Sequence, residues 1–181
     1  PNPKYWDQKP TIKKVTFKFI TDSAAAFQAF KAGEVQAMYP QPQPDALLQI
    51  KKGLPGASYN IAPSSASVEA LWLNNSAKPF DDINFRQAIA YAIDRNAIVK
   101  RLFGPLGITT AWNSFNPPIS AAYADPSGFS VYTKDLAKVA SLMGAAGYTK
   151  SGGYWTKNGK RASFTLKTTT GNQRRSLTAQ I

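Results

Sequence analysis

The clearest hydrophobic pattern in the chain lies between residues 82 and 103. Apolar residues recur there at helical spacing, at Phe85, Ala88, Ile89, Ala92 and Ile93. Asp82 or Asn84 can cap the first turn, and Asp94 can cap a second helix that ends before Gly104. The pattern therefore predicts a helix pair over residues 82–103. A single apolar face of this kind most often packs in a core, so by itself it carries no function.

The start of the chain alternates between apolar and polar positions. Within residues 11–20, Val15, Phe17 and Phe19 fall on one side, which is typical of a half-buried strand. A helix follows, capped by Thr21, Asp22 or Ser23 and ended by Gly33, and residues 34–39 have the pattern of a second strand. A strand, a helix and a strand in this order predict an α/β unit with parallel pairing. A short helix over residues 45–52 comes next.

Two segments carry side chains suited to recognition. Proline alternates with glutamine over residues 40–44, which indicates an extended polar loop. This loop is either a simple spacer or a ligand loop that presents Tyr39, Gln41 and Gln43, since α/β sheets bind ligands at the carboxyl ends of their strands. Residues 67–75 are mostly apolar on both sides and predict a strand buried in the middle of a sheet. Trp72 in that strand fits either a core position or an aromatic shelf in a cleft.

The second half of the chain predicts a loop, a helix and a hairpin. Residues 113–126 are rich in Asn, Pro, Ser and Ala, which is typical of the irregular loops that often carry recognition. Thr133 can cap a helix over residues 134–147. Residues 153–169 form a hairpin pattern in which Asn158-Gly159 supplies a tight turn. A further helix begins near Asn172, and its apolar face lacks a following partner, as we expect of a piece of a longer protein.

The composition disfavours an enzyme. A chain of 181 residues can bury one sizeable core or two modest lobes, and no apolar run approaches the roughly 18 residues of a membrane span. The chain contains neither cysteine nor histidine, which removes most zinc sites, cysteine nucleophiles and Ser-His-Asp triads. The ten acidic residues are scattered, so a hydrolase with paired carboxylates has no support. We expect no catalytic residues, no metal site and no cofactor.

The formal net charge of +12 raises the question of an anionic partner. The 22 Lys and Arg residues occur as scattered singles and pairs, such as Lys13-Lys14 and Arg174-Arg175, without a basic helix. We therefore expect a solvated basic surface and no nucleic-acid partner. The alternative is a basic domain that binds nucleic acid or an anionic envelope, and it predicts tight binding that weakens steeply with salt.

Five sequences, in order along nearly the whole chain, resemble the family 5 extracellular solute-binding proteins, which are the peptide and nickel receptors of ABC importers. They are NPKYW at residues 2–6, GEVQA at 33–37, NN at 74–75, PFDDINFRQAIAYAIDR at 79–95 and AKVASLMGAAGY at 137–148. Gln36 stands where the family usually has Asp, and Met143-Gly144 replaces the usual Leu. The similarity lies in the order of the five sequences together.

The resemblance implies an α/β fold of two lobes, like a type II periplasmic binding protein, with mixed sheets flanked by helices and a hinge between the lobes. The chain would be the middle fragment of a much longer one, with residues 1–58 in lobe one and residues 59–181 in lobe two. The implied function is the substrate-binding component of an ABC importer, which captures peptides or a related solute and delivers them to the permease subunits. The implied location is extracytoplasmic, in the periplasm or at the outer face of the cell membrane, with membrane contact only through an anchor outside this segment.

The resemblance also implies which residues face the ligand. Tyr39 and Gln41 correspond to a lobe-one loop that faces the cleft, and Ala70, Leu71 and Trp72 correspond to the lobe-two strand beneath the peptide. Glu69, beside that strand, is a candidate partner for an ammonium group. We expect this piece alone to bind solute weakly, because closure needs contacts from both lobes.

Overall fold

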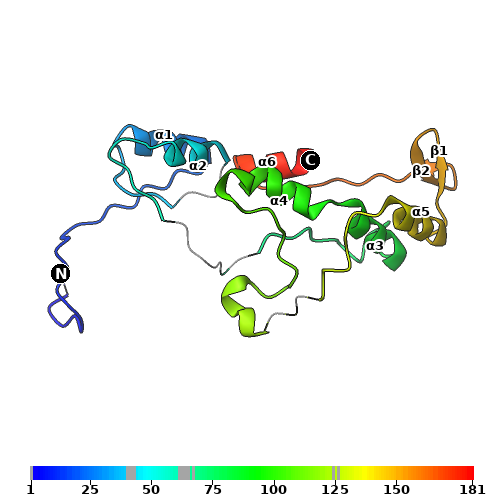
Figure 1. The fold of residues 1–181 in the computed structure, drawn as a ribbon, viewed down its shortest axis with the longest axis horizontal. Helices are drawn as coiled ribbons and strands as arrows, with labels where there is room; N and C mark the ends of the chain where they lie inside the picture. Colours follow the sequence, from blue (N-terminus) through cyan, green and yellow to red (C-terminus); the bar gives the residue numbers. More distant parts are fainter. Residues whose placement is uncertain (1, 40–43, 61–65, 67, 124, 126) are drawn as a thin grey trace.

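The computed structural model describes residues 2–39, 44–60, 66, 68–123, 125 and 127–181, and these form an elongated arrangement of short elements (Figure 1). Helices α1 and α2 lie at one end, α3, α5 and a small sheet lie at the other end, and α4 and α6 lie between them. The helices are α1 (Ser23–Lys31), α2 (Pro44–Lys51), α3 (Ile83–Ala92), α4 (Arg95–Phe103), α5 (Leu136–Ala145) and α6 (Gln173–Gln180). Two short 3-10 segments are η1 (Gly104–Leu106) and η2 (Pro118–Tyr123).

Carboxylate and amide side chains begin five of these helices. The N-cap residues, which accept hydrogen bonds from backbone N–H groups of the first turn, are Asp22, Asp82, Asp94, Asp135 and Asn172. The predicted helix pair over residues 82–103 is confirmed as α3 and α4. The predicted cap at Thr133 is wrong: the Asp135 carboxylate accepts from the Lys138 N–H at 2.9 Å, so α5 begins only after Asp135.

A small apolar core holds α3 against α5. Phe85 is 2% exposed and packs with Ala88 and Met143. The rings of Phe80 and Tyr148 lie 5.7 and 5.5 Å from the ring of Phe85. Phe85 and Ala88 of the apolar face that the sequence predicts for α3 are therefore buried against α5, whereas Ala92 at its end is exposed.

The sheet is antiparallel and small. Its strands are β1 (Thr149–Ser151), β2 (Tyr154–Lys157) and β3 (Lys160–Arg161), in the order β1-β2-β3. Asn158 and Gly159 have positive φ angles of 52° and 71°, as the predicted tight turn requires. The hairpin is shorter than the predicted range of 153–169, since β3 ends at Arg161 and no strand follows it in the described residues.

The three other predicted strands are absent from the described residues. Residues 11–20, residues 34–39 and the described part of residues 67–75 make no ladder with a neighbouring strand. Phe17 and Phe19 are 79% and 92% exposed, which rules out a half-buried strand. The physical reason is that alternation sets which side chains share a face, whereas a strand also needs a hydrogen-bonded neighbour. The described part thus contains helices and a small antiparallel sheet, and the mixed sheets with parallel pairing are not seen in it.

Polar bonds join the α1–α2 end to the middle of the molecule. The Ser23 hydroxyl donates to the Gly171 carbonyl oxygen at 3.0 Å. The Gln173 side-chain amide donates to the Asp45 carboxylate at 3.0 Å, and the Lys51 ammonium donates to the Pro105 carbonyl oxygen at 2.6 Å. These bonds place α1 and α2 beside α6 and η1.

The burial of Phe85 predicts a large cost for its truncation. Phe85→Ala should lower the free energy of unfolding by about 3 to 5 kcal/mol, since it removes a buried ring and leaves a cavity between α3 and α5. Urea denaturation followed by circular dichroism measures this loss. Ile83→Ala is the matched control, because Ile83 begins the same helix and is 57% exposed, so its loss should stay within roughly 0.5 kcal/mol. Equal losses for the two variants would contradict the described core.

Candidate functional site

The segment from Ala70 to Trp72 presents side chains to solvent. Leu71 is 44% exposed and Trp72 is 77% exposed, and Ala70 is exposed as well. The Trp72 ring meets the ring of Phe115 edge to face, with ring centres 6.3 Å apart and planes at 88°. We call Trp72 and Phe115 the aromatic pair. This exposure argues against the core position for Trp72, and a role as an aromatic shelf in a cleft stays a prediction.

The second member of this pair comes from a loop with fixed internal bonds. This Phe115 loop comprises residues 111–116. The Trp112 indole N–H donates to the Asn116 carbonyl oxygen at 2.6 Å. Ser114 is 7% exposed, and its hydroxyl oxygen accepts from the backbone N–H groups of Asn116 and Asp125 at 3.2 and 3.1 Å. The loop is irregular, as the sequence predicts, but its backbone is held in place.

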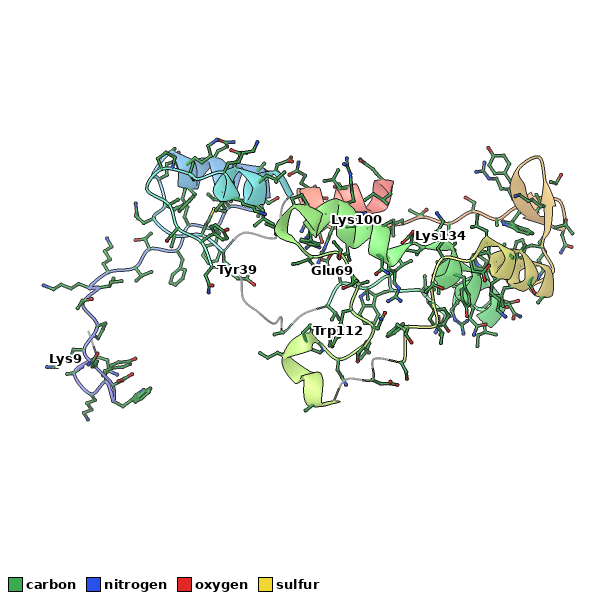
Figure 2. All side chains as sticks on the ribbon, viewed as in Figure 1. Lys9, Tyr39, Glu69, Lys100, Trp112 and Lys134 are labelled. Carbon is green, nitrogen blue, oxygen red and sulfur yellow. The ribbon has the colours of Figure 1, made fainter. Side chains whose placement is uncertain are left out.

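Arg95 at the start of α4 attaches the Phe115 loop to the rest of the molecule. Its guanidinium group donates to four oxygens, those of Trp112 O, Asn113 Oδ1, Phe129 O and Tyr132 O, at 3.3, 3.0, 2.7 and 3.3 Å. The neighbouring Asn96 side-chain oxygen accepts from the Ala111 N–H at 2.8 Å. A polar cavity of about 270 Å³ lies beside these bonds. Figure 2 shows Trp112 below α4.

Glu69 is bound by two arginines of α6. Its carboxylate forms ion pairs with Arg174 and Arg175, the latter at 2.9 Å from Nε. The Arg174 side chain is only 6% exposed, against 45% for Glu69. Burial, and then the charge of Arg175, lower the pKa of Arg174 from its ordinary value, and an arginine remains charged at neutral pH. Glu69 thus fixes the segment before Trp72 on α6, and its carboxylate is already paired with cations.

The predicted lobe-one residues lie elsewhere. Tyr39 is 96% exposed and lies at the α1–α2 end of the molecule (Figure 2). No ring contact joins Tyr39 to Trp72 among the described residues. Gln41 falls outside the residues that the structure describes. The structure therefore brings Phe115 to Trp72 and leaves Tyr39 apart from them.

Phe115 is the residue that sequence reasoning missed. It lies in the loop that the sequence marks for recognition, but no periodicity distinguishes it from its polar neighbours. The nearest signal is the pair of aromatic residues, Trp112 and Phe115, within an otherwise polar loop.

Two kinds of site are absent from the described part of the chain. It holds no group of three or more His, Cys, Asp and Glu residues that could bind a metal ion. None of its helices is both long enough and apolar enough to cross a membrane. What the site offers is exposed aromatic surface beside a cluster of two guanidinium groups and one carboxylate.

The ion pairs of Glu69 predict a loss of stability when its charge is removed. Glu69→Gln should lower the free energy of unfolding by roughly 1 to 3 kcal/mol, because the buried Arg174 loses its partner charge. Urea denaturation measures the loss. Glu34→Gln is the matched control, since the Lys18–Glu34 pair is about half exposed on both sides and should contribute less than about 1 kcal/mol. A loss for Glu69→Gln no larger than that of the control would contradict the role of this pair.

The turn after the Phe115 loop lowers the pKa of Asp125, and this effect can be measured. Hydrogen bonds from the hydroxyl and then the amide of Ser127 hold the pKa of Asp125 below its ordinary value of 3.8. Because the folded-state pKa is lowered, this carboxylate stabilises the turn above about pH 4, and the contribution is lost as the pH falls through the folded-state pKa. Ser127→Ala should raise the pKa of Asp125 toward 3.8, as measured by NMR titration of its carboxyl carbon. Ser130→Ala, in the same turn, should leave it unchanged. A pKa that stays low in Ser127→Ala would exclude the hydroxyl bond as its main cause.

Comparison with known proteins gives the chain its family. Residues 1–181 match the family described as bacterial extracellular solute-binding proteins, family 5, middle region. Similar relatives include the dipeptide-binding protein of Escherichia coli, 30% identical over 147 residues, and a glutathione-binding protein of Salmonella typhimurium, 34% identical over 146 residues. These alignments cover 81% and 80% of this chain but 26% and 27% of the relatives.

An oligopeptide-binding protein of Lactococcus lactis subsp. lactis is 31% identical over an alignment that covers 99% of this chain and 32% of the relative. The chain thus spans between a quarter and a third of the length of these relatives. The family consists of solute-binding proteins, which are binding proteins and not enzymes, as the composition predicts. The chain belongs to the family 5 bacterial extracellular solute-binding proteins.

Proposed function

We propose that this protein is the substrate-binding component of an ABC importer, which captures peptides outside the membrane and delivers them to the permease subunits. The observation that carries the proposal is the family match over residues 1–181, together with relatives named for binding dipeptides, oligopeptides and glutathione. On this proposal the protein acts in the periplasm or at the outer face of the cell membrane, held there by an anchor outside this segment. It needs no catalytic residue and no cofactor.

The proposed fold of the intact protein has two lobes of the periplasmic-binding type, with residues 1–58 in lobe one and residues 59–181 in lobe two. The bonds between these two parts support the division, because they are polar: Ser23 to Gly171, Gln173 to Asp45 and Lys51 to Pro105. Polar contacts of this kind are typical of domains that move relative to each other. The relatives are longer than this chain, which covers 26% of the dipeptide-binding protein. On this proposal, the stretches at residues 11–20 and 67–75 pair with strands that correspond to the additional length of the relatives.

The proposed site holds the peptide between the lobes. Ala70, Leu71 and Trp72 would lie beneath it, and Tyr39 and Gln41 would approach it from lobe one. Affinity would come largely from hydrogen bonds to the peptide backbone, which every peptide offers. Closure would follow because the closed form makes contacts from both lobes that the open form lacks.

The geometry supports a positioning role for Glu69 within this site. Its carboxylate is paired with Arg174 and Arg175, so the three side chains together carry one net positive charge. A peptide ammonium group would be repelled by that net positive charge. Glu69 therefore serves the site by holding the segment that carries Trp72.

A binding titration with the intact protein tests the proposal. Isothermal calorimetry with di- to pentapeptides should show saturable binding, and Trp72→Ala should weaken it by about tenfold, as for an aromatic anchor at the centre of a site. Trp6→Ala is the matched control, because Trp6 is 87% exposed and contacts Tyr5 in the N-terminal segment, so binding should be unchanged. If the wild-type protein bound no peptide, no glutathione and no nickel complex, the proposed function would be wrong.

A further inference from the structure

We propose that the aromatic pair, Trp72 and Phe115, forms a subsite for an uncharged apolar or aromatic side chain of the bound peptide. This inference rests on the proposed function. It adds Phe115 as a residue that determines specificity, and it states which class of peptide the protein prefers. Four observations carry it: the exposure of the two rings, their mutual geometry, the rigidity of the loop and the charge around them.

The two rings offer surface that their mutual contact does not use. Trp72 is 77% exposed and Phe115 is 63% exposed, although they touch. In an edge-to-face pair at 88° the edge of one ring meets the face of the other, so other faces remain open. A third ring or an aliphatic side chain can pack into the angle between them, where it contacts both.

The Phe115 loop is organised before any ligand arrives. The residues on both sides of Phe115 are fixed, since Ser114 is buried and Asn116 accepts from the Trp112 indole N–H. Arg95 and Asn96 then hold the start of the loop on α4. A ring presented by a fixed backbone loses little conformational entropy on binding, so more of its contact energy remains as affinity.

The positive charge on the segment before Trp72 disfavours a cationic occupant. Trp72 lies three residues after Glu69, whose carboxylate is paired with Arg174 and Arg175 and leaves one net positive charge there. A lysine or arginine side chain of a peptide would be attracted by the ring faces but repelled by this charge and by the net charge of +12. An apolar side chain gains the ring contacts without that repulsion.

Tripeptide titrations of the intact protein test the subsite. The probes are trialanine, the three tripeptides that carry one Phe among Ala residues, and the same three with Lys in place of Phe. The wild-type protein should bind one Phe peptide more tightly than trialanine by about three- to tenfold, the range expected for an aromatic contact, and no Lys peptide more tightly. Phe115→Ala should abolish this preference, whereas Phe115→Tyr should retain it.

Ile119→Ala is the matched control, because Ile119 is also 63% exposed and lies shortly after the Phe115 loop; its preference should equal that of the wild type. If the wild-type protein binds trialanine but shows no preference for Phe, or if Phe115→Ala weakens all peptides alike, the subsite is wrong and the proposed function stands. If no peptide binds, both are wrong. A fall in melting temperature of more than about 5 °C in Phe115→Ala would show that protein, and not ligand, covers the ring, and would overturn the subsite.

Discussion

The hydrogen bonds of Arg95 are the interaction on which the placement of the candidate site depends. A guanidinium group carries five N–H donors in a rigid plane, so one side chain can satisfy several oxygens at once. Arg95 uses this property to bind oxygens of residues 112, 113, 129 and 132, which belong to no regular element. Backbone carbonyl oxygens in an irregular segment have no partner in a sheet or helix, so the hydrogen-bond donors have to come from elsewhere. Here the Arg95 side chain provides them. Together with the Asn96 bond to the Ala111 N–H, these bonds hold the loop that carries Phe115 on α4.

The same principle explains how the parts of the molecule are joined. The apolar core around Phe85 reaches only α3, α5 and the hairpin, whereas α1 and α2 meet the middle of the molecule through polar bonds. This affects how the net charge of +12 is interpreted, because some of the cations are internal. The sequence predicts that the 22 cations are solvated, but Arg174 is 5% exposed and pairs with Glu69, and the guanidinium group of Arg95 donates to four internal oxygens. These arginines act as structural donors and do not contribute to a free basic surface.

The features that could be predicted from the sequence are those that depend on residues close together along the chain. Helix starts follow from aspartates such as Asp22 and Asp82, and the turn of the hairpin follows from Asn158-Gly159. The predicted strands failed because their formation depends on a partner strand that no local pattern supplies. At the site, alternation and family resemblance pointed to Trp72, but Phe115 pairs with it across a long stretch of chain and has no periodic pattern of its own. The ion pairs of Glu69 could not be predicted either, because Arg174 and Arg175 are equally remote in sequence.

The bond between Ser23 and Gly171 spans 148 positions, and this separation affects the order in which the chain assembles. Contacts between close neighbours along a chain form early, and contacts that close a long loop form late. On a ribosome the N-terminal helix would emerge well before Gly171 has been made, and it would wait unattached while α3, α5 and the hairpin condense. During that interval α1 and α2 lack the polar bonds that join them to the middle of the molecule.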